Sequence, residues 1–285
     1  MVLSRKFKVL LRPLYLWTIN TRLYQAISHS QGDWRYPYLS FVWWFSSLLV
    51  PRRKVSVDDV SFTLQCDNWI THFRWYLFRT KEIEVRNYID VYLKDTDIFF
   101  DIGANIGVFS LYASKRHMNL NTYCFEPEYS NLHYLKENIL KNNLMDRIKI
   151  YSIAVSESNG LSSLHVQDLT PGAAVHTESK SDINTTDEGY TVVWREGVAI
   201  KTIDSLCQEL RTIPNALKID TDGNELKILK GATETLKNNL LRSMVLEMPP
   251  SKKEARKCAD ILLLAGFTLE WSHENTRNEI WVRRT

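Results

Sequence analysis

Short apolar runs alternate with longer amphipathic stretches from Ile98 to the C-terminus, and this alternation limits the possible folds more than any other feature. Strands that alternate with helices predict a parallel sheet with helices on both faces. The chain ends in two consecutive apolar runs, 267–271 and 279–283, which predict a hairpin with one antiparallel strand. The other predicted strands are 98–102, 122–125, 148–155, 216–220 and 243–247, and the predicted helices are 108–115, 131–142, 202–210, 225–236 and 252–264. The fold class is therefore α/β, a Rossmann-like doubly wound sheet of seven strands.

Charge divides the chain into two parts. The 285 residues have a net charge of only +3, but residues 1–55 contain nine Lys or Arg against one acid, Asp33. This front part is rich in Trp and Tyr, and its apolar residues recur at near-helical spacing. We expect a basic, aromatic, mainly helical segment at 1–55 and a main domain at 56–285. Within the main domain, 56–92 is a lead-in and 156–200 is an irregular insertion.

The loop after the first predicted strand carries the first chemical signal. It reads Asp101-Ile-Gly103-Ala104-Asn105-Ile-Gly107. In a doubly wound sheet, ligands bind beyond the carboxyl ends of the strands, where the strand order reverses. Gly103 permits a tight turn, and Gly107 lets the next helix begin close to the sheet, where free N–H groups favour an anionic group. The carboxylate of Asp101 can accept a hydrogen bond from an ammonium group.

The second predicted strand ends in another acid, Glu126. Dinucleotide folds and S-adenosylmethionine folds both place an acid here to accept hydrogen bonds from ribose hydroxyls. The first loop reads G-x-N-x-G, which differs from the G-x-G-x-x-G of dinucleotide sites, and Asp101 suits the zwitterionic end of S-adenosylmethionine. A seven-stranded sheet with a closing hairpin is also the architecture of class I methyltransferases. These features together predict S-adenosylmethionine as the cofactor.

Four stretches resemble the FkbM-type methyltransferases: Phe100–Ala113, Phe125–Ile139, Ile200–Leu206 and Leu217–Ala232. The resemblance runs from about Asp97 to about Glu247, and the last stretch is the most specific because generic methyltransferases lack it. The family's usual form there is K-I-D-x-E-G-x-E, so this chain has Asp222 where glutamate is usual. The resemblance implies S-adenosylmethionine-dependent O-methylation, often of a sugar hydroxyl in a glycan or glycolipid, or of a natural-product hydroxyl.

The resemblance also implies which residues bind the cofactor. Asp101, Gly103, Ala104, Asn105 and Gly107 would hold its methionine part, and Glu126 would hold the ribose, with Asn131 and Ala154 near the ribose and adenine. For Glu126, a helix cap or a solvated loop acid is the simpler alternative.

Methyl transfer to a hydroxyl requires the reacting atoms to be aligned and a group that takes the hydroxyl proton. Asp220 and Asp222, just after the fourth strand, are the best placed candidates. Lys218 lies on the same strand face as Asp220, so it can orient that carboxylate or lower its pKa. Glu225 is a further candidate, although a first-turn helix acid is its simpler interpretation. The insertion, expected near the acceptor site, contains His165 and His176, and lone histidines are more often structural than catalytic.

Asp220, Asp222 and Glu247 could also bind a divalent cation that lowers the pKa of the hydroxyl. The sequence does not favour this alternative, and we assign no metal ligands. The four cysteines are far apart and form no CxxC pair, so neither a zinc site nor a disulfide framework is expected, and a reducing cytosol fits best.

Three other functions fit parts of the sequence. Asp220-Thr-Asp222 matches the D-x-D that binds a nucleotide-sugar and metal in glycosyltransferases, but this function leaves the Asp101–Gly107 loop unexplained. A nucleic-acid methyltransferase would use the basic front to contact phosphates, yet the N-P-P-Y tetrad of base-flipping enzymes is absent, and we expect no nucleic-acid partner. A non-catalytic, membrane-associated binding module would not need an intact cofactor loop.

We expect a saccharide or glycoconjugate acceptor and a cytoplasmic location. The segment 1–55 predicts a helical cap on the catalytic domain or peripheral contact with the anionic inner membrane surface. No apolar span reaches the roughly 18–20 residues that a membrane-spanning helix needs. The longest, Leu39–Val50, is interrupted by serines.

Overall fold

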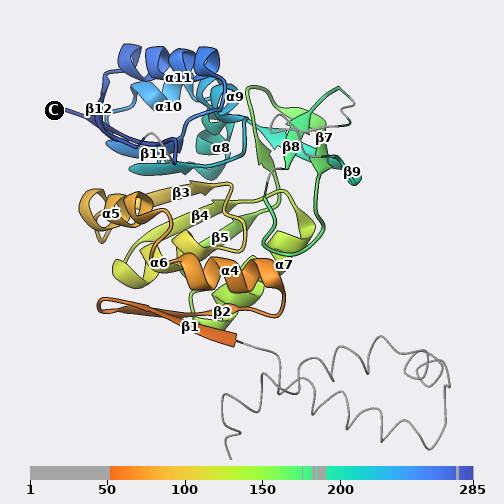
Figure 1. Ribbon diagram of the computed structural model, residues 1–285. Helices are drawn as coiled ribbons and strands as arrows, with labels where there is room; N and C mark the ends of the chain where they lie inside the picture. Colours follow the sequence, from red (N-terminus) through yellow and green to blue (C-terminus); the bar gives the residue numbers. More distant parts are fainter. Residues whose placement is uncertain (1–51, 175, 182–183, 185–190, 274–275, 285) are drawn as a thin grey trace, which may run out of the picture. The chain divides into compact units, whose positions relative to one another are not determined.

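The computed structural model describes residues 52–174, 176–181, 184, 191–273 and 276–284 (Figure 1). The predicted helical segment at 1–55 lies outside this part of the chain, apart from its last residues. Those residues belong to strand β1 (Arg52–Val57), which pairs with β2 (Val60–Gln65) in a two-stranded sheet. The first strand therefore begins before the boundary predicted at residue 55. The helical cap and the membrane contact of the front segment stay predictions.

The central sheet has seven strands in the order β12-β13-β11-β10-β3-β4-β5 (Figure 1). Their bounds are Ile98–Ile102 (β3), Asn121–Phe125 (β4), Ile148–Tyr151 (β5), Ala216–Ile219 (β10), Ser243–Glu247 (β11), Phe267–Ser272 (β12) and Asn278–Arg283 (β13). The neighbours from β11 to β5 pair in parallel, and β13 is antiparallel to both β11 and β12. The predicted class I methyltransferase fold with a terminal hairpin is confirmed.

Helices cover both faces of this sheet because its strands are apolar on both sides. In β3, Phe99 belongs to one buried cluster and Phe100 to the other, since neighbouring side chains of a strand point to opposite faces. The first cluster includes residues of α5 (Ile83–Tyr92), α6 (Val108–Arg116) and α7 (Tyr129–Lys141). The second includes residues of α8 (Ile203–Leu210), α9 (Glu225–Lys230), α10 (Thr233–Lys237) and α11 (Lys252–Leu264). The lead-in also contains α4 (Trp69–Leu77).

Two predicted elements differ in the structure. The strand predicted at 148–155 is divided into β5 and β6 (Ala154–Val155), because the chain leaves the central sheet after Tyr151. The helix predicted at 225–236 is broken into α9 and α10 at Gly231, the C-cap residue of α9. Gly231 packs so closely on another segment that a Cβ atom there would lie 2.3 Å from the carbonyl oxygen of Ser156.

The insertion forms a second sheet. Its four strands have the order β6-β9-β7-β8, where β7 is Gly160–Val166, β8 is Thr177–Ser179 and β9 is Trp194–Lys201. The described part of the insertion, predicted as irregular, therefore contains regular strands. No helix in the described ranges has the length and hydropathy that a membrane span requires.

Candidate active site

A cavity of about 410 Å³ lies at the carboxyl ends of β3, β4, β10 and β11. The strand order reverses between β3 and β10, which are neighbours in the sheet. Doubly wound folds bind their ligands at this point, and the volume falls within the roughly 300–1,000 Å³ of small-molecule sites. The predicted site residues that line the cavity are Gly103, Asn105, Glu126, Asn131, Ala154, Asp220 and Asp222.

Gly103 brings the first loop into direct contact with the loop after β10. Its φ angle is +75°, and a Cβ atom there would lie 1.8 Å from the backbone oxygen of Asp220. Its N–H group donates to the carbonyl oxygen of Phe125 at 2.9 Å. The backbone at Gly103 therefore approaches Asp220 so closely that only a residue without a side chain fits there.

Glu126 presents a buried carboxylate to the cavity. Its Oε2 atom accepts a hydrogen bond from the backbone N–H of Asn105 at 2.7 Å, and its Oε1 atom accepts one from the N–H of Glu128 at 3.0 Å. Burial raises the pKa of Glu126 to about 7, although these backbone hydrogen bonds oppose the increase. Such a carboxylate can accept hydrogen bonds from ribose hydroxyls.

Asn105 and Asn131 hold a loop of the insertion against the cavity. The Nδ2 atom of Asn105 donates to the carbonyl oxygen of Ala173 at 2.6 Å, and that of Asn131 donates to the same oxygen at 3.2 Å. The Oδ1 atom of Asn131 accepts from the N–H of Gly172 at 2.7 Å. Ala173 lines the cavity too. The insertion therefore supplies one wall of the site, and two side chains predicted to contact the cofactor position that wall.

Asp101 lies behind the cavity and pairs with Lys218. The Nζ atom of Lys218 is 3.2 Å from Oδ1 of Asp101 and 3.4 Å from Oδ2 of Asp220, and Ser110 Oγ donates to Asp101 Oδ2 at 2.5 Å. Burial lowers the pKa of Lys218, but the two carboxylates outweigh this effect and raise it overall. The ion pair predicted between Lys218 and Asp220 is present. Contact between Asp101 and a cofactor ammonium group stays a prediction, and its partner in the structure is Lys218.

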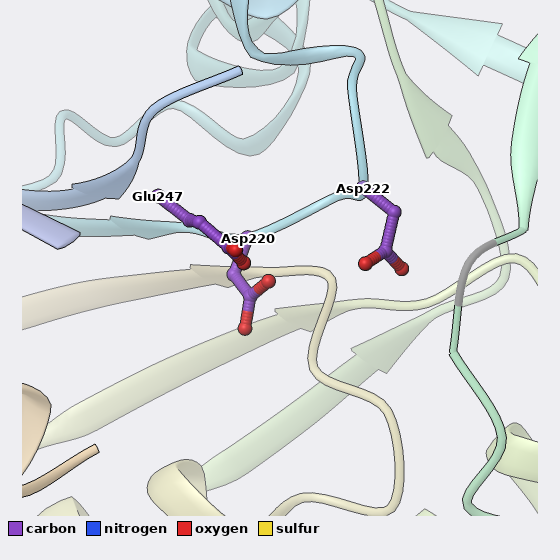
Figure 2. A group of neighbouring side chains, drawn as sticks. All are labelled: Asp220, Asp222 and Glu247. Atoms are coloured by element: carbon purple, nitrogen blue, oxygen red, sulfur yellow. The ribbon is translucent and has the colours of Figure 1, made fainter. Parts of the chain in front are cut away.

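Asp220, Asp222 and Glu247 face one space at the edge of the sheet (Figure 2). One carboxylate oxygen from each lies within 4.8 Å of the others. Asp220 and Glu247 share a hydrogen bond. Burial raises the pKa of Asp220, but the charge of Lys218 and the bond with Glu247 outweigh it, so the pKa is lower than usual. Burial and the charge of Asp220 raise the pKa of Glu247.

Because the pKa of Asp220 is lowered and that of Glu247 is raised, Asp220 is the ionised member of the pair at neutral pH and Glu247 is the protonated member. The Nη2 atom of Arg277 donates to Oε1 of Glu247 at 2.7 Å, which fixes the orientation of that side chain.

The three acids have a geometry that could also hold a divalent cation. Because acidic groups of this kind are common without an ion, we assign no metal ligands.

Glu225 positions the loop that carries Asp220 and Asp222. Its Oε1 atom accepts from the backbone N–H and the hydroxyl of Thr221, both at 3.0 Å, and its Oε2 atom accepts from the N–H of Gly223 at 3.1 Å. Its side chain is buried and is not among the residues that line the cavity. Glu225 is therefore a positioning residue in this structure, which is more than a first-turn acid but less direct than a catalytic group.

Ala104 and Gly107 also lie outside the cavity lining. Ala104 is buried in the apolar cluster around α6. Gly107 precedes α6 with a φ angle of +84°, and a Cβ atom there would lie 2.4 Å from Cδ1 of Leu135 in α7. Both residues serve the packing of the loop on the neighbouring helices.

Several cavity residues were not predicted from the sequence: Arg74, Lys81, Glu82, Glu178 and Arg277. Glu247, considered only as a metal ligand, ends β11 and could have been found by the same rule that selected Asp220. Arg74 has no local signal, because its place depends on how α4 packs. His176 lines the cavity, and burial lowers its pKa. Its ring nitrogens make no hydrogen bond within the described ranges.

Known proteins resemble this chain over more than half of its length. The sequence model of the Methyltransferase FkbM domain matches residues 101–278, more than half of the chain. Methyltransferase sdnD of Sordaria araneosa is 28% identical over 192 residues, which are 60% of this chain and 73% of the relative. The 31-O-demethyl-FK506 methyltransferase FkbM of Streptomyces tacrolimicus is 34% identical over 200 residues, which are 63% of this chain and 75% of the relative.

A solved structure, methyltransferase FkbM from Methylobacillus flagellatus KT, aligns with a TM-score of 0.49 at 15% identity. The alignment covers 76% of this chain and 55% of that protein. The family match begins at Asp101 in β3 and ends at Asn278 in β13, so it includes the loops that build the cavity. The chain belongs to the FkbM methyltransferase family and is a methyltransferase with the class I fold of S-adenosylmethionine-dependent methyltransferases.

Proposed function

We propose that this protein is an S-adenosylmethionine-dependent O-methyltransferase that acts on a hydroxyl group of a saccharide or glycoconjugate. The observation that carries the proposal is the state of Asp220. Its carboxylate lines the cavity, its side chain is 33% exposed, and Lys218 keeps it ionised. An ionised carboxylate in this place can accept the proton of a hydroxyl group.

The residues around the cavity fit the cofactor. Glu126 offers a carboxylate for the ribose hydroxyls, and Phe125, Ile153 and Ala154 offer an apolar wall for the adenine ring. The Gly103 loop lies between that wall and Asp220 and would hold the methionine part. When bound, S-adenosylmethionine supplies a methyl group that is activated by its positively charged sulfur.

The acids at the ends of β10 and β11 have different roles in the proposed reaction. Asp220 takes the hydroxyl proton on one of its Oδ atoms, and Lys218 orients this carboxylate from behind. Glu247 donates a hydrogen bond to Asp220, and Arg277 fixes Glu247. Asp222 lies at the cavity wall with its carboxylate near Asp220, where it can orient the acceptor by hydrogen bonding. The insertion loop around Ala173 excludes water from one side.

A natural-product hydroxyl is the second candidate acceptor. It is supported by the relative named as a 31-O-demethyl-FK506 methyltransferase, whose match covers 63% of this chain. Methyl transfer to either acceptor requires the same catalytic groups, so the acids in the cavity do not distinguish the two acceptor classes.

Binding and turnover test the proposal in two steps. We expect calorimetry to show that the full-length chain binds S-adenosylhomocysteine, and the labelled methyl group of S-adenosylmethionine to be transferred to a glycan or glycolipid fraction. Absence of S-adenosylhomocysteine binding would refute the cofactor assignment. Transfer to hydroxylated natural products alone would favour the second acceptor class.

The variant Asp220→Asn tests the base. It should lower kcat by about 10²–10⁴-fold, the usual range for a general base, with S-adenosylhomocysteine affinity retained. Asp222→Asn is the matched control and should mainly raise KM for the acceptor. Near-normal turnover of Asp220→Asn would remove this residue from the mechanism.

A further inference from the structure

A second cavity, of about 250 Å³, adjoins the catalytic one and has a different chemistry. Its walls come from α4, from the turn before α5, from the start of α6 and from the insertion loop. Its larger apolar lining residues are Ile70, Phe73, Leu77, Phe78, Val108 and Phe109. We call this space the side cavity.

The side cavity and the catalytic cavity have a common boundary. Five residues line both: Arg74, Lys81, Glu82, Ala173 and Ala174. The two cavities are therefore adjacent at these residues. At about 250 Å³ the side cavity is smaller than a typical small-molecule site, so it suits part of a ligand better than a whole one.

The polar groups at the boundary already have partners. The Nε atom of Arg74 donates to the carbonyl oxygen of Gly172 at 2.6 Å, and Lys81 forms an ion pair with Glu82 at 3.0 Å. Beyond these residues the wall is mainly aliphatic and aromatic: Ile70, Phe73, Leu77, Phe78, Val108 and Phe109. A sugar placed there would lose hydrogen bonds to water with few replacements, whereas a hydrocarbon group would lose none.

Phe109 connects the side cavity to the proposed catalytic residues. The Nζ atom of Lys218 lies 5.8 Å from the centre of the Phe109 ring, and the same atom pairs with Asp220. A group that contacts Phe109 in the side cavity is thus one aromatic ring away from the cation that holds the base. The side cavity therefore lies close to the proposed base.

We propose that the side cavity binds a hydrocarbon portion of the acceptor, so that the substrate is an amphipathic hydroxyl compound and not a free sugar. This inference rests on the proposed function, because it assigns the acceptor of the same site. The occupant is a hydrocarbon chain or ring system covalently attached to the unit that carries the methylated hydroxyl.

The test uses n-alkyl β-D-glucosides from methyl to octyl, each below its micelle concentration, with the full-length chain saturated with S-adenosylhomocysteine. Affinity should rise about fourfold for each added methylene, which corresponds to about 0.8 kcal/mol, until the side cavity is full. The slope with chain length is the readout, so the sugar need not be the natural one.

Two exposed aromatic residues of α4 give matched variants. Phe73 lines the side cavity and is 43% exposed, whereas Tyr76 is 67% exposed and is not among the lining residues. Phe73→Ser should weaken octyl glucoside binding by about tenfold, and Tyr76→Ser should leave it unchanged. Ile70→Ser provides a second lining variant if Phe73→Ser does not fold.

An affinity that is the same for all chain lengths would overturn the proposal, as would equal effects of Phe73→Ser and Tyr76→Ser. S-adenosylhomocysteine binding separates the two levels. If S-adenosylhomocysteine binds and the series is flat, only this inference fails. If S-adenosylhomocysteine does not bind, the proposed function fails with it.

Discussion

The Nζ atom of Lys218 lies 3.2 Å from Oδ1 of Asp101, and both side chains are almost fully buried, with exposed fractions of 4% and 1%. Burial of two charges is costly unless further polar groups stabilise them. Here Ser110 donates to Asp101, and Lys218 donates to the carbonyl oxygen of Gly103 at 3.3 Å. Because Lys218 also reaches Asp220, one buried cation joins the first strand of the sheet to the proposed base.

Replacing the cation of this pair should destabilise the fold. Lys218→Met leaves Asp101 as an uncompensated buried charge, so we expect a loss of about 3–5 kcal/mol in the free energy of unfolding, measured in urea. The control is Lys230→Met, which breaks an exposed pair with Glu157 and should cost at most about 1 kcal/mol. The double variant Lys218→Met/Asp101→Asn should recover part of the loss. Equal stability of the two lysine variants would contradict the importance of the buried pair.

The direct contact between the two loops at Gly103 predicts that a side chain at this position lowers both stability and cofactor affinity. Gly103→Ala would place a Cβ atom 1.8 Å from the backbone oxygen of Asp220 and would strain a φ angle of +75°. We expect the free energy of unfolding to fall by more than about 1 kcal/mol and S-adenosylhomocysteine affinity to fall at least about tenfold.

The matched control is Gly197→Ala in β9, where a Cβ atom would meet nothing within 4 Å. Its stability should remain within about 0.5 kcal/mol of the wild type. Normal cofactor binding by Gly103→Ala would show that the loop after β10 can move away without loss of the site.

The pKa of Glu126 predicts a pH dependence of cofactor binding. Burial raises this pKa to about 7 in the unliganded protein, and hydrogen bonds from ribose hydroxyls favour the ionised carboxylate. Protons and cofactor therefore compete, so S-adenosylhomocysteine affinity should be constant above pH 7 and fall by up to about tenfold per pH unit below it. Calorimetric titrations between about pH 5.5 and about pH 8.5, on both sides of that pKa, would measure the change in affinity.

Glu126→Gln is the control for this titration. It removes the ionisable group, so its affinity should be lower at pH 8 but should no longer change through the range. If the affinity of the wild type does not change between about pH 5.5 and about pH 8.5, Glu126 does not contact the cofactor as an ionised group.

The parts of the site that were predictable from the sequence follow from local rules. Gly103, Glu126 and Asp220 each come directly after an apolar strand, and the carboxyl ends of parallel strands meet at one edge of the sheet. Arg74 follows no such rule. It reaches the cavity only because α4 packs beside the insertion loop, and its Nε atom donates to Gly172, which is far away in the chain.

Roles were harder to predict than positions. The residue pattern places Asp101 and Lys218 in strands but does not show that they face each other, because β3 and β10 are far apart in sequence. Their register, with Lys218 opposite Asp101, is a property of the assembled sheet. The break of the predicted helix at Gly231 likewise depends on a close contact with Ser156, which is far away in the chain.

The amino-acid sequence alone predicts the alternation of strands and helices, the closing hairpin and the acids at the strand ends, because hydrophobic periodicity and turn residues are properties of short stretches of chain. The tertiary structure decided which acid is ionised, which groups pair behind the site, and that an apolar side cavity adjoins the catalytic one. These properties depend on burial and on distances between segments that meet only after folding. Electrostatic and hydrophobic effects of this kind are set by the assembled surroundings of a residue, and its neighbours in sequence do not determine them.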